Sequence, residues 1–171
     1  MQRIAIIGPS GSGKSTLART LGEHTGLPVF HIDSIHWKPG WVESDQAETR
    51  AAVEGIARGE QWILDGNYSS SFAERMARAD TVIFLDLPRR RYFPRIFRRM
   101  LRYYGRTRPD LGPDCPERFD WEFVVWVWNF HRDSRHRILD ALDRTDGNFT
   151  LYTLRTPAEV RRFIAGKFPA S

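Results

Sequence analysis

The stretch GPSGSGKST (residues 8–16) follows directly on the apolar run RIAII (residues 3–7) and decides the fold. It matches the spacing G-x-x-x-x-G-K-[ST] in full, and Leu17 and Leu21 then lie on one face of the helix that should follow. The glycines let successive backbone N–H groups turn toward phosphate oxygens, and the helix N-terminus adds its positive dipole end. We therefore expect a phosphate-binding loop built from Gly8, Ser10, Gly11, Ser12, Gly13, Lys14, Ser15 and Thr16.

Two side chains of this loop have specific expected roles. The Lys14 amine should reach the β- and γ-phosphates of a nucleotide, and the Ser15 hydroxyl should ligate Mg²⁺. A glycine-rich turn that matched the spacing by chance would lack the strand before it and the helix after it. We therefore read the chain as a nucleotide binder.

Length and composition limit the remaining possibilities. A chain of 171 residues, 41% of them hydrophobic, suits one compact domain. No window approaches the roughly 20 apolar residues of a membrane span, and the first expected strand begins almost at Met1. We expect a cytoplasmic protein without a membrane partner, either a monomer or a homodimer. The single cysteine, Cys115, lies in a Pro/Gly-rich stretch and is expected to be incidental.

Five continuous apolar runs predict buried parallel strands, at residues 4–7, 29–32, 62–64, 81–85 and 149–152. Each run is separated from the next by enough chain for a crossover helix. The predicted fold class is therefore α/β, a doubly wound parallel sheet flanked by helices. Ligands of such sheets gather at the carboxyl ends of the strands.

The basic residues are unevenly distributed. There are 26 Lys and Arg against 21 Asp and Glu, and nine arginines with no acid between Arg89 and Arg108. This segment should carry a positive field directed at anions. Nucleotide phosphates, a phosphorylated acceptor and a nucleic-acid backbone all remain open as its partner.

Two later segments differ in character. Residues 103–118 are rich in Gly and Pro and irregular, which predicts a mobile lid over a site. Residues 119–130 are dense in aromatics, and we expect a helix buried on more than one side, with these rings as core. A stacking platform for nucleic acid is the alternative.

With these features, the chain resembles the P-loop nucleoside/nucleotide kinase group of adenylate, shikimate and gluconate kinases. Within it, the stretches HIDSIHWKPGW (residues 31–41) and WILDGNY (residues 62–68) resemble the family labelled DNA topology modulation protein (FlaR-like). The resemblance implies a five-stranded P-loop NTPase fold with a lid, and ATP and Mg²⁺ as cofactors.

The resemblance also implies residue roles. Asp65 matches the aspartate that holds magnesium through water, and Arg95 and Arg99 match the lid-entry arginines that cover adenine and contact donor phosphates. Solvated charges on a basic helix are the alternative for these two arginines. Arg132 and Arg135 resemble, at a shorter spacing, the lid-exit arginines that clamp the transferred phosphoryl group. Arg155 lies in the turn that meets adenine.

The departures from adenylate kinase concern the acceptor. His36 and Ser69 stand where that family has arginines that grip a monophosphate, which argues against such an acceptor. In sugar and shikimate kinases an aspartate after the second strand instead accepts the proton of a substrate hydroxyl, and Asp33 stands there. A helix N-cap is the equally weighted alternative for Asp33.

An acceptor pocket with aromatic walls and polar tips would then be lined by Asp33, His36, Trp37, Trp41, Asn67 and Tyr68. Packing under a loop is the alternative for the two tryptophans. The hypothesis is an ATP-dependent small-molecule kinase with Lys14, Asp33, Arg99, Arg132 and Arg135 as catalytic residues. A nucleotide-regulated DNA-associated protein and an ATPase switch are the alternatives, and nucleic acid is the less favoured partner.

Overall fold

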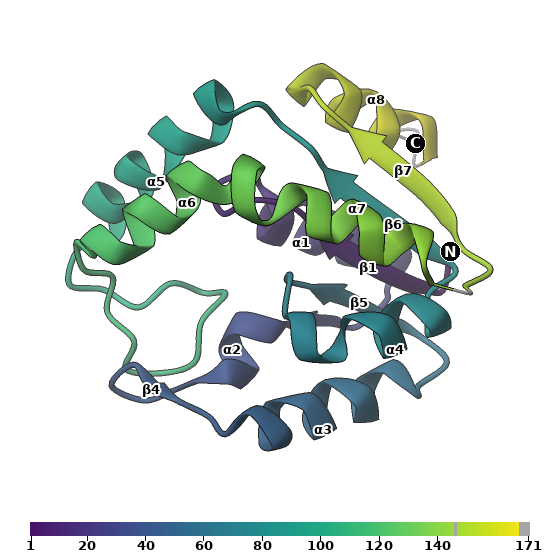
Figure 1. The fold of residues 1–171 in the computed structure, drawn as a ribbon, viewed down its shortest axis with the longest axis horizontal. Coiled ribbons are helices and arrows are strands. Elements are labelled where there is room, and N and C mark those ends of the chain that lie inside the picture. The colour runs from purple at the N-terminus through teal and green to yellow at the C-terminus, as the bar shows by residue number, and fades with distance from the viewer. Residues whose placement is uncertain (146, 168–171) are drawn as a thin grey trace.

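The computed structural model describes residues 1–145 and 147–167 (Figure 1). In chain order its elements are β1 (Arg3–Ile7), α1 (Lys14–Thr25), β2 (Val29–His31), α2 (Ile32–His36), β3 (Trp37–Lys38), β4 (Val42–Glu43), α3 (Gln46–Ala57), β5 (Trp62–Asp65), a 3-10 turn (Ser69–Ser71), α4 (Phe72–Arg78), β6 (Thr81–Leu85), α5 (Arg89–Tyr103), α6 (Trp121–Asp133), α7 (Arg135–Asp143), β7 (Thr150–Leu154) and α8 (Pro157–Lys167).

The main sheet confirms the predicted fold class. Its five strands are all parallel, in the order β2-β5-β1-β6-β7. They are the five predicted apolar runs, with shifts of one or two residues at the ends of every strand except β6. The antiparallel pair β3–β4 was not predicted, because its strands of two residues each carry no readable alternation.

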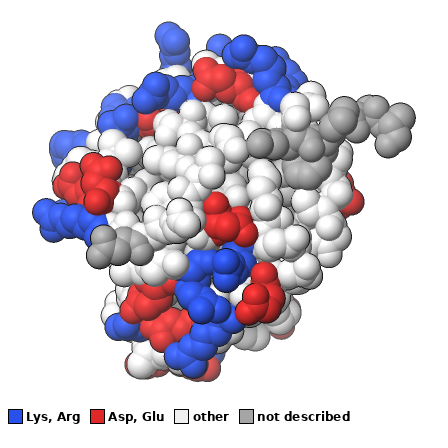
Figure 2. All heavy atoms as spheres, turned by 90° about the vertical axis from the view of Figure 1, so that its right-hand side faces the viewer, with Lys and Arg blue, Asp and Glu red and all other residues white. Residues whose placement is uncertain are grey.

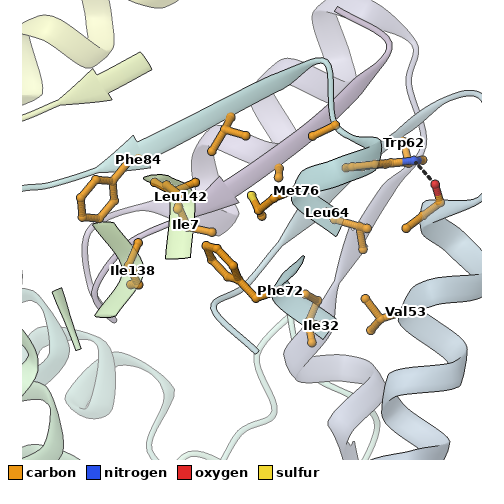
Figure 3. Packing of buried hydrophobic residues seen from close by; sticks show 14 of the residues in the cluster. Ile7, Ile32, Val53, Trp62, Leu64, Phe72, Met76, Phe84, Ile138 and Leu142 are labelled. Atoms are coloured by element: carbon orange, nitrogen blue, oxygen red, sulfur yellow. Dashed lines mark hydrogen bonds between the residues drawn. The ribbon is translucent and has the colours of Figure 1, made fainter. Parts of the chain in front are cut away.

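The strands are continuously apolar because both faces of the sheet are covered. In β1, Ile4 and Ile6 point to a core shared with α1 and α8, whereas Ala5 and Ile7 point to a core shared with α3, α4, α6 and α7. Figure 3 shows the second core, in which Phe72 and Met76 of α4 approach Ile7. These two layers hold the strand ends rigidly.

The parallel register brings three strand ends together at one edge. Ile6 of β1 and His31 of β2 both pair with Asp65 of β5, so Asp65 lies between the phosphate-binding loop and the start of α2. Chemistry-bearing residues from residues 8–16, 33–37 and 65–68 therefore meet at the carboxyl edge, as expected for this sheet class.

Helix α6 corrects the expectation of a buried aromatic helix. Only Val124, Val127 and Phe130 are buried along it, while Trp121, Trp126 and Trp128 are 65%, 47% and 48% exposed. Phe130 joins the sheet core and Val127 packs against α5, so α6 is buried along one stripe of residues and not on several sides. The tryptophans are therefore not core residues.

Charge is mixed on the face beside β7 and α8. Figure 2 shows basic and acidic side chains next to one another around an area without charged residues. The nine arginines of residues 89–108 lie instead in α5 and in the segment that follows it. Among the described residues, no helix has the length and apolarity needed to cross a membrane.

Candidate functional site

A cavity of about 890 Å³ lies at the carboxyl edge of the sheet. The phosphate-binding loop and the start of α1 form its floor, α2 and residues 65–69 form one wall, and α5, α6 and α7 form the other. Arg108, Pro109 and Asp110 of the segment between α5 and α6 also line the cavity. Five of the nine arginines between residues 89 and 108 line it, namely Arg95, Arg98, Arg99, Arg102 and Arg108. The positive segment thus faces the cavity, which fits an anionic ligand.

The loop backbone has the geometry that the motif requires. Gly8 and Gly11 have positive φ values of 144° and 78°, and a Cβ on either would lie 2.6 Å from the carbonyl oxygen of Leu85 or Tyr92. No side chain fits at these two positions. Gly13 then provides the left-handed residue from which α1 begins at Lys14.

Asn67 has a different role from the one predicted. Its Oδ1 accepts the backbone N–H of Gly8 at 2.9 Å, and its Nδ2 donates to the carbonyl of Gly8 at 2.7 Å. Both ends of the amide are therefore committed to the phosphate-binding loop, although the residue borders the cavity. Asn67 braces the loop and is removed from the acceptor-binding set.

Lys14 lies inside the cluster of charges at the cavity floor. Its Nζ donates to the Pro9 carbonyl at 3.1 Å. Burial lowers the pKa of the Lys14 amine, while the nearby Asp65 and Asp33 carboxylates oppose the shift. An anionic ligand at this point would both replace the carbonyl as acceptor and favour the charged amine.

Asp65 and Ser15 supply oxygen donors suited to Mg²⁺. The Asp65 side chain is 5% exposed; its Oδ2 lies 2.9 Å from His31 Nδ1, while its buried Oδ1 has no hydrogen-bond partner among the described residues. A hydrated cation would satisfy that oxygen. No group of three His, Cys, Asp or Glu within residues 1–145 and 147–167 is placed to hold a metal alone. Mg²⁺ at such sites keeps water and phosphate ligands, so the residues fit the ion.

Asp33 is not the N-cap of α2. His31 occupies that position without a side-chain cap, and Asp33 lies in the first turn. It borders the cavity and is exposed to solvent, while nearby protein atoms desolvate part of the carboxyl. This desolvation raises the pKa of the Asp33 carboxyl, Lys14 opposes the shift, and Asp65 adds to it. The structure thus removes the capping alternative and places the Asp33 carboxyl in the cavity that the phosphate-binding loop also lines.

The predicted lid reaches into the cluster. Asp110 Oδ2 accepts the Ser15 hydroxyl at 3.2 Å and the Arg108 guanidinium at 3.0 Å. Arg108 is also ion-paired with Glu117 at 2.7 Å, and Glu117 lies 3.4 Å from Arg99. These lid contacts were not predicted, because a segment without periodicity does not reveal which of its residues turn inward.

Three further lid contacts fix its seat on the α2 side. The Gly40 N–H donates to the Asp114 carbonyl at 2.8 Å, and the Trp41 indole donates to the Pro116 carbonyl at 2.8 Å. Cys115 is buried and its thiol donates to the Lys38 carbonyl, so it has a packing role. Trp41 therefore helps to hold the lid segment against residues 38–41.

The two predicted lid-entry arginines do lie at the loop. Arg99 donates to Ser10 Oγ at 3.1 Å, and Arg95 lies 3.5 Å from the Ser12 carbonyl. Burial lowers the pKa of the Arg99 guanidinium, with Arg108 acting in the same direction and Glu117 opposing it. Both side chains line the cavity, which favours the phosphate role over that of solvated surface charges.

Three other predicted arginines lie outside the cavity. Arg132 is 71% exposed and pairs with its neighbour Asp133, because α6 turns that position outward. Arg135 forms a two-point ion pair with Asp86 at 2.8 Å, and Arg155 approaches the same carboxylate at 3.7 Å. None of these three arginines is among the residues that line the cavity. Arg137, which no motif indicated, lines the cavity from α7.

His36, Trp37 and Tyr68 form the predicted aromatic wall. His36 packs against Trp37 and Tyr68 with ring centroids 4.9 and 5.4 Å apart, and all three border the cavity. His36 Nδ1 and Tyr68 Oη are buried and have no partner among the described residues. These two atoms are available to a polar ligand.

The loop that carries Tyr68 is held by a buried arginine. Arg75 of α4 is fully buried and donates to the carbonyls of Gly66, Tyr68 and Ser71. Burial lowers the pKa of the Arg75 guanidinium to about 10, against the attraction of Asp65 and Glu74. Three carbonyl bonds thus fix residues 66–71 relative to the helix.

Two solved structures share the fold along nearly the whole chain. A shikimate kinase from Bacteroides thetaiotaomicron superposes with a TM-score of 0.56 at 17% identity, covering 97% of this chain and 98% of that one. A shikimate kinase from Acinetobacter baumannii, solved with shikimate, gives 0.55 at 15% identity over 99% and 96%. At this identity the likeness concerns the fold, which is that of the P-loop kinases.

Sequence comparison gives a curated relative and a family. A tRNA dimethylallyltransferase from Synechococcus sp. (strain CC9902) is 33% identical over 90 residues, which are 51% of this chain but 29% of that protein. The chain thus spans less than a third of the length of this relative. The model of the AAA domain family matches residues 4–102, more than half of the chain, from the first strand through the phosphate-binding loop to α5. The chain therefore belongs to the AAA domain family.

Proposed function

We propose that this protein is a phosphotransferase that moves the γ-phosphoryl group of ATP to a hydroxyl of a small acceptor. The observation that carries the proposal is that Lys14 of the phosphate-binding loop and Asp33 of α2 border the same cavity, close enough for each to shift the pKa of the other. A donor site and a proton acceptor are thus side by side, as phosphoryl transfer needs.

The donor phosphates would lie on the backbone of residues 8–13. Lys14 would contact the β- and γ-phosphates, and Arg99 and Arg108 would neutralise charge on the transferred group from the lid side. Ser15 and Asp65 would hold Mg²⁺, which would supply positive charge next to the donor phosphates.

The acceptor would lie between α2 and α6. Asp33 would orient its hydroxyl and accept the proton, while Trp37 and Tyr68 would contact its apolar parts. His36 Nδ1 and Tyr68 Oη would bind its other polar groups. Positions 36 and 69 carry no arginine, which favours an acceptor other than a nucleoside monophosphate.

The test is consumption of Mg·ATP with pooled acceptors: nucleosides, nucleoside monophosphates, sugars, sugar acids and shikimate. We expect one pool to stimulate consumption, and Lys14→Ala to reduce the stimulated rate about 100-fold or more. Lys38→Ala is the matched control, since Lys38 pairs with Glu48 at the exposed end of β3 and should leave the rate unchanged.

Two results would contradict the proposal. Stimulated turnover retained in folded Lys14→Ala would remove the phosphate-binding loop from the reaction. ATP hydrolysis that no acceptor stimulates would instead indicate the ATPase switch, in which water is the only acceptor.

A further inference from the structure

The lid carboxylate of Asp110 reaches the hydroxyl that a nucleotide-bound Mg²⁺ would use. Ser15 lies in the first turn of α1, and Asp110 lies 95 residues later in the covering segment, yet Asp110 Oδ2 accepts the Ser15 hydroxyl at 3.2 Å. The Asp110 side chain is only 14% exposed. It is therefore enclosed at the metal side of the cavity floor.

A second observation independently indicates a cation at this point. Asp65 borders the same cavity with a side chain 5% exposed, and His31 occupies only its Oδ2. Its Oδ1 is buried and has no partner among the described residues. An unsatisfied buried carboxylate oxygen is costly unless a ligand donates to it or coordinates it.

The carboxylates around Ser15 also favour a cation among them once phosphates arrive. Asp33, Asp65 and Asp110 all lie close enough to Lys14 to act on its charge. A nucleotide polyphosphate would add several more negative charges to these three carboxylates. Arg108 is already ion-paired with Asp110 and Glu117, so it offsets only part of the charge on this side of the cavity.

We infer that Asp110 is a metal-site residue supplied by the lid, which accepts hydrogen bonds from the water ligands of the nucleotide-bound Mg²⁺. Mg²⁺ usually keeps several waters, and partners that hold those ligands strongly affect metal affinity. The inference deepens the proposed function, because it rests on a metal–nucleotide complex at the phosphate-binding loop.

The experiment measures binding alone, with the non-hydrolysable analogue AMP-PNP and Mn²⁺ as probes. Calorimetric titration of AMP-PNP in excess Mn²⁺ and again in EDTA gives the factor by which the metal tightens nucleotide binding. We expect Asp110→Asn to reduce that factor about tenfold or more, while the affinity in EDTA stays close to that of the wild type. Asp110→Glu, which keeps the carboxylate, should retain more of the factor than Asp110→Asn.

Asp114→Asn is the matched control. It removes the same charge from the same segment, but the Asp114 side chain is exposed and only its backbone carbonyl holds Gly40. Its φ of 53° is one that asparagine tolerates. The metal factor of this variant should equal that of the wild type.

Two outcomes would overturn the inference. An unchanged metal factor in Asp110→Asn would mean that Asp110 only pairs with Arg108. A tighter EDTA affinity with no loss of the metal factor would mean that Asp110 competes with the phosphates. If instead the factor falls as expected but no acceptor is phosphorylated, this inference stands and the proposed transfer fails; a wild type that binds no AMP-PNP removes both.

Discussion

Asp33 and Lys14 form the residue pair on which the proposed chemistry depends. Each is shifted away from its ordinary pKa in the direction that favours the neutral form: desolvation raises the pKa of Asp33 and lowers that of Lys14. The two charges also oppose these shifts by attracting each other. Such pairs of perturbed groups beside a cavity are typical of catalytic sites.

The shift at Asp33 has a consequence for stability. A carboxyl whose pKa is raised in the folded protein binds its proton more tightly there than in the unfolded chain. Its contribution favours folding at low pH and is lost as pH rises through the folded pKa, so ionised Asp33 costs stability at neutral pH. We predict that Asp33→Asn raises the thermal midpoint at pH 7.5, by an amount that shrinks toward pH 4. It should also reduce acceptor-stimulated turnover about 100-fold or more.

Asp80 provides the opposite control for that measurement. Despite the effect of partial burial, the Thr81 hydroxyl and the backbone N–H groups of Gln2 and Arg3 hold its pKa below the ordinary value. Its stabilisation is present at neutral pH and lost on acidification, so Asp80→Asn should lower the midpoint at pH 7.5. A lower midpoint for Asp33→Asn at that pH would contradict the account of Asp33.

The positions of residues were predictable where the motif is local. Lys14 and Ser15 could be located in sequence because the loop geometry fixes them relative to a strand and a helix. Asn67 was predicted to line the acceptor pocket, and its two hydrogen bonds with Gly8 were not predicted. These bonds span 59 residues and depend on the pairing of β1 with β5. Arg132 was misplaced because spacing along α6 does not say which face turns to the cavity.

At the scale of elements, the lid is the part that tertiary contacts define most. Residues 103–118 were predicted as a mobile lid. Of this segment, Tyr103 and residues 108–110 line the cavity, and its backbone forms bridges at Tyr104–Glu117 and Thr107–Pro116. Their inward carboxylates could not be predicted, since neither periodicity nor a motif marks them. For α6 the prediction was wrong in the opposite way. Its apolar composition suggested burial on more than one side, but only the stripe of Val124, Val127 and Phe130 is buried.

A substitution at Gly112 tests whether the lid packs against α2 and β3 as the structure shows. A Cβ at this position would lie 2.8 Å from the Trp37 carbonyl oxygen and 3.5 Å from that of Ser34, both of which belong to backbone. We predict that Gly112→Ala displaces the lid, which should increase amide hydrogen exchange across residues 103–118 and weaken Mg·AMP-PNP binding.

Gly55 is the control for this substitution. It lies in α3, and a Cβ at this position would point into open space. Gly55→Ala should therefore stabilise the fold by about 0.5–1 kcal/mol and leave lid exchange unchanged. If amide hydrogen exchange across residues 103–118 were equal in the wild type and in Gly112→Ala, the described packing of the lid would be contradicted.

At the scale of the whole molecule, the sequence was most informative about the sheet. All five strands were predictable because a sheet covered on both faces needs continuous apolar runs, and each run is long enough to read. The same sheet brings β1, β2 and β5 to one edge, so the floor of the site followed from the fold. The walls of the site could not be predicted in this way. They are formed by α5, α6 and the lid, whose positions depend on side-chain packing.

The whole-molecule arrangement also explains where the positive charge acts. Five arginines from α5 and the lid face the cavity, while the face beside β7 and α8 mixes both signs (Figure 2). In this account, the arginines that line the cavity act on its anionic ligand.

The central claim is that the γ-phosphoryl group of ATP reaches an acceptor hydroxyl, and ³¹P NMR of the stimulated reaction tests it most directly. The account predicts that the γ-phosphate signal is replaced by that of a phosphomonoester on the acceptor, in step with the appearance of ADP, and that Lys14→Ala shows neither change. A reaction in which the lost γ-phosphate appears only as inorganic phosphate would contradict it.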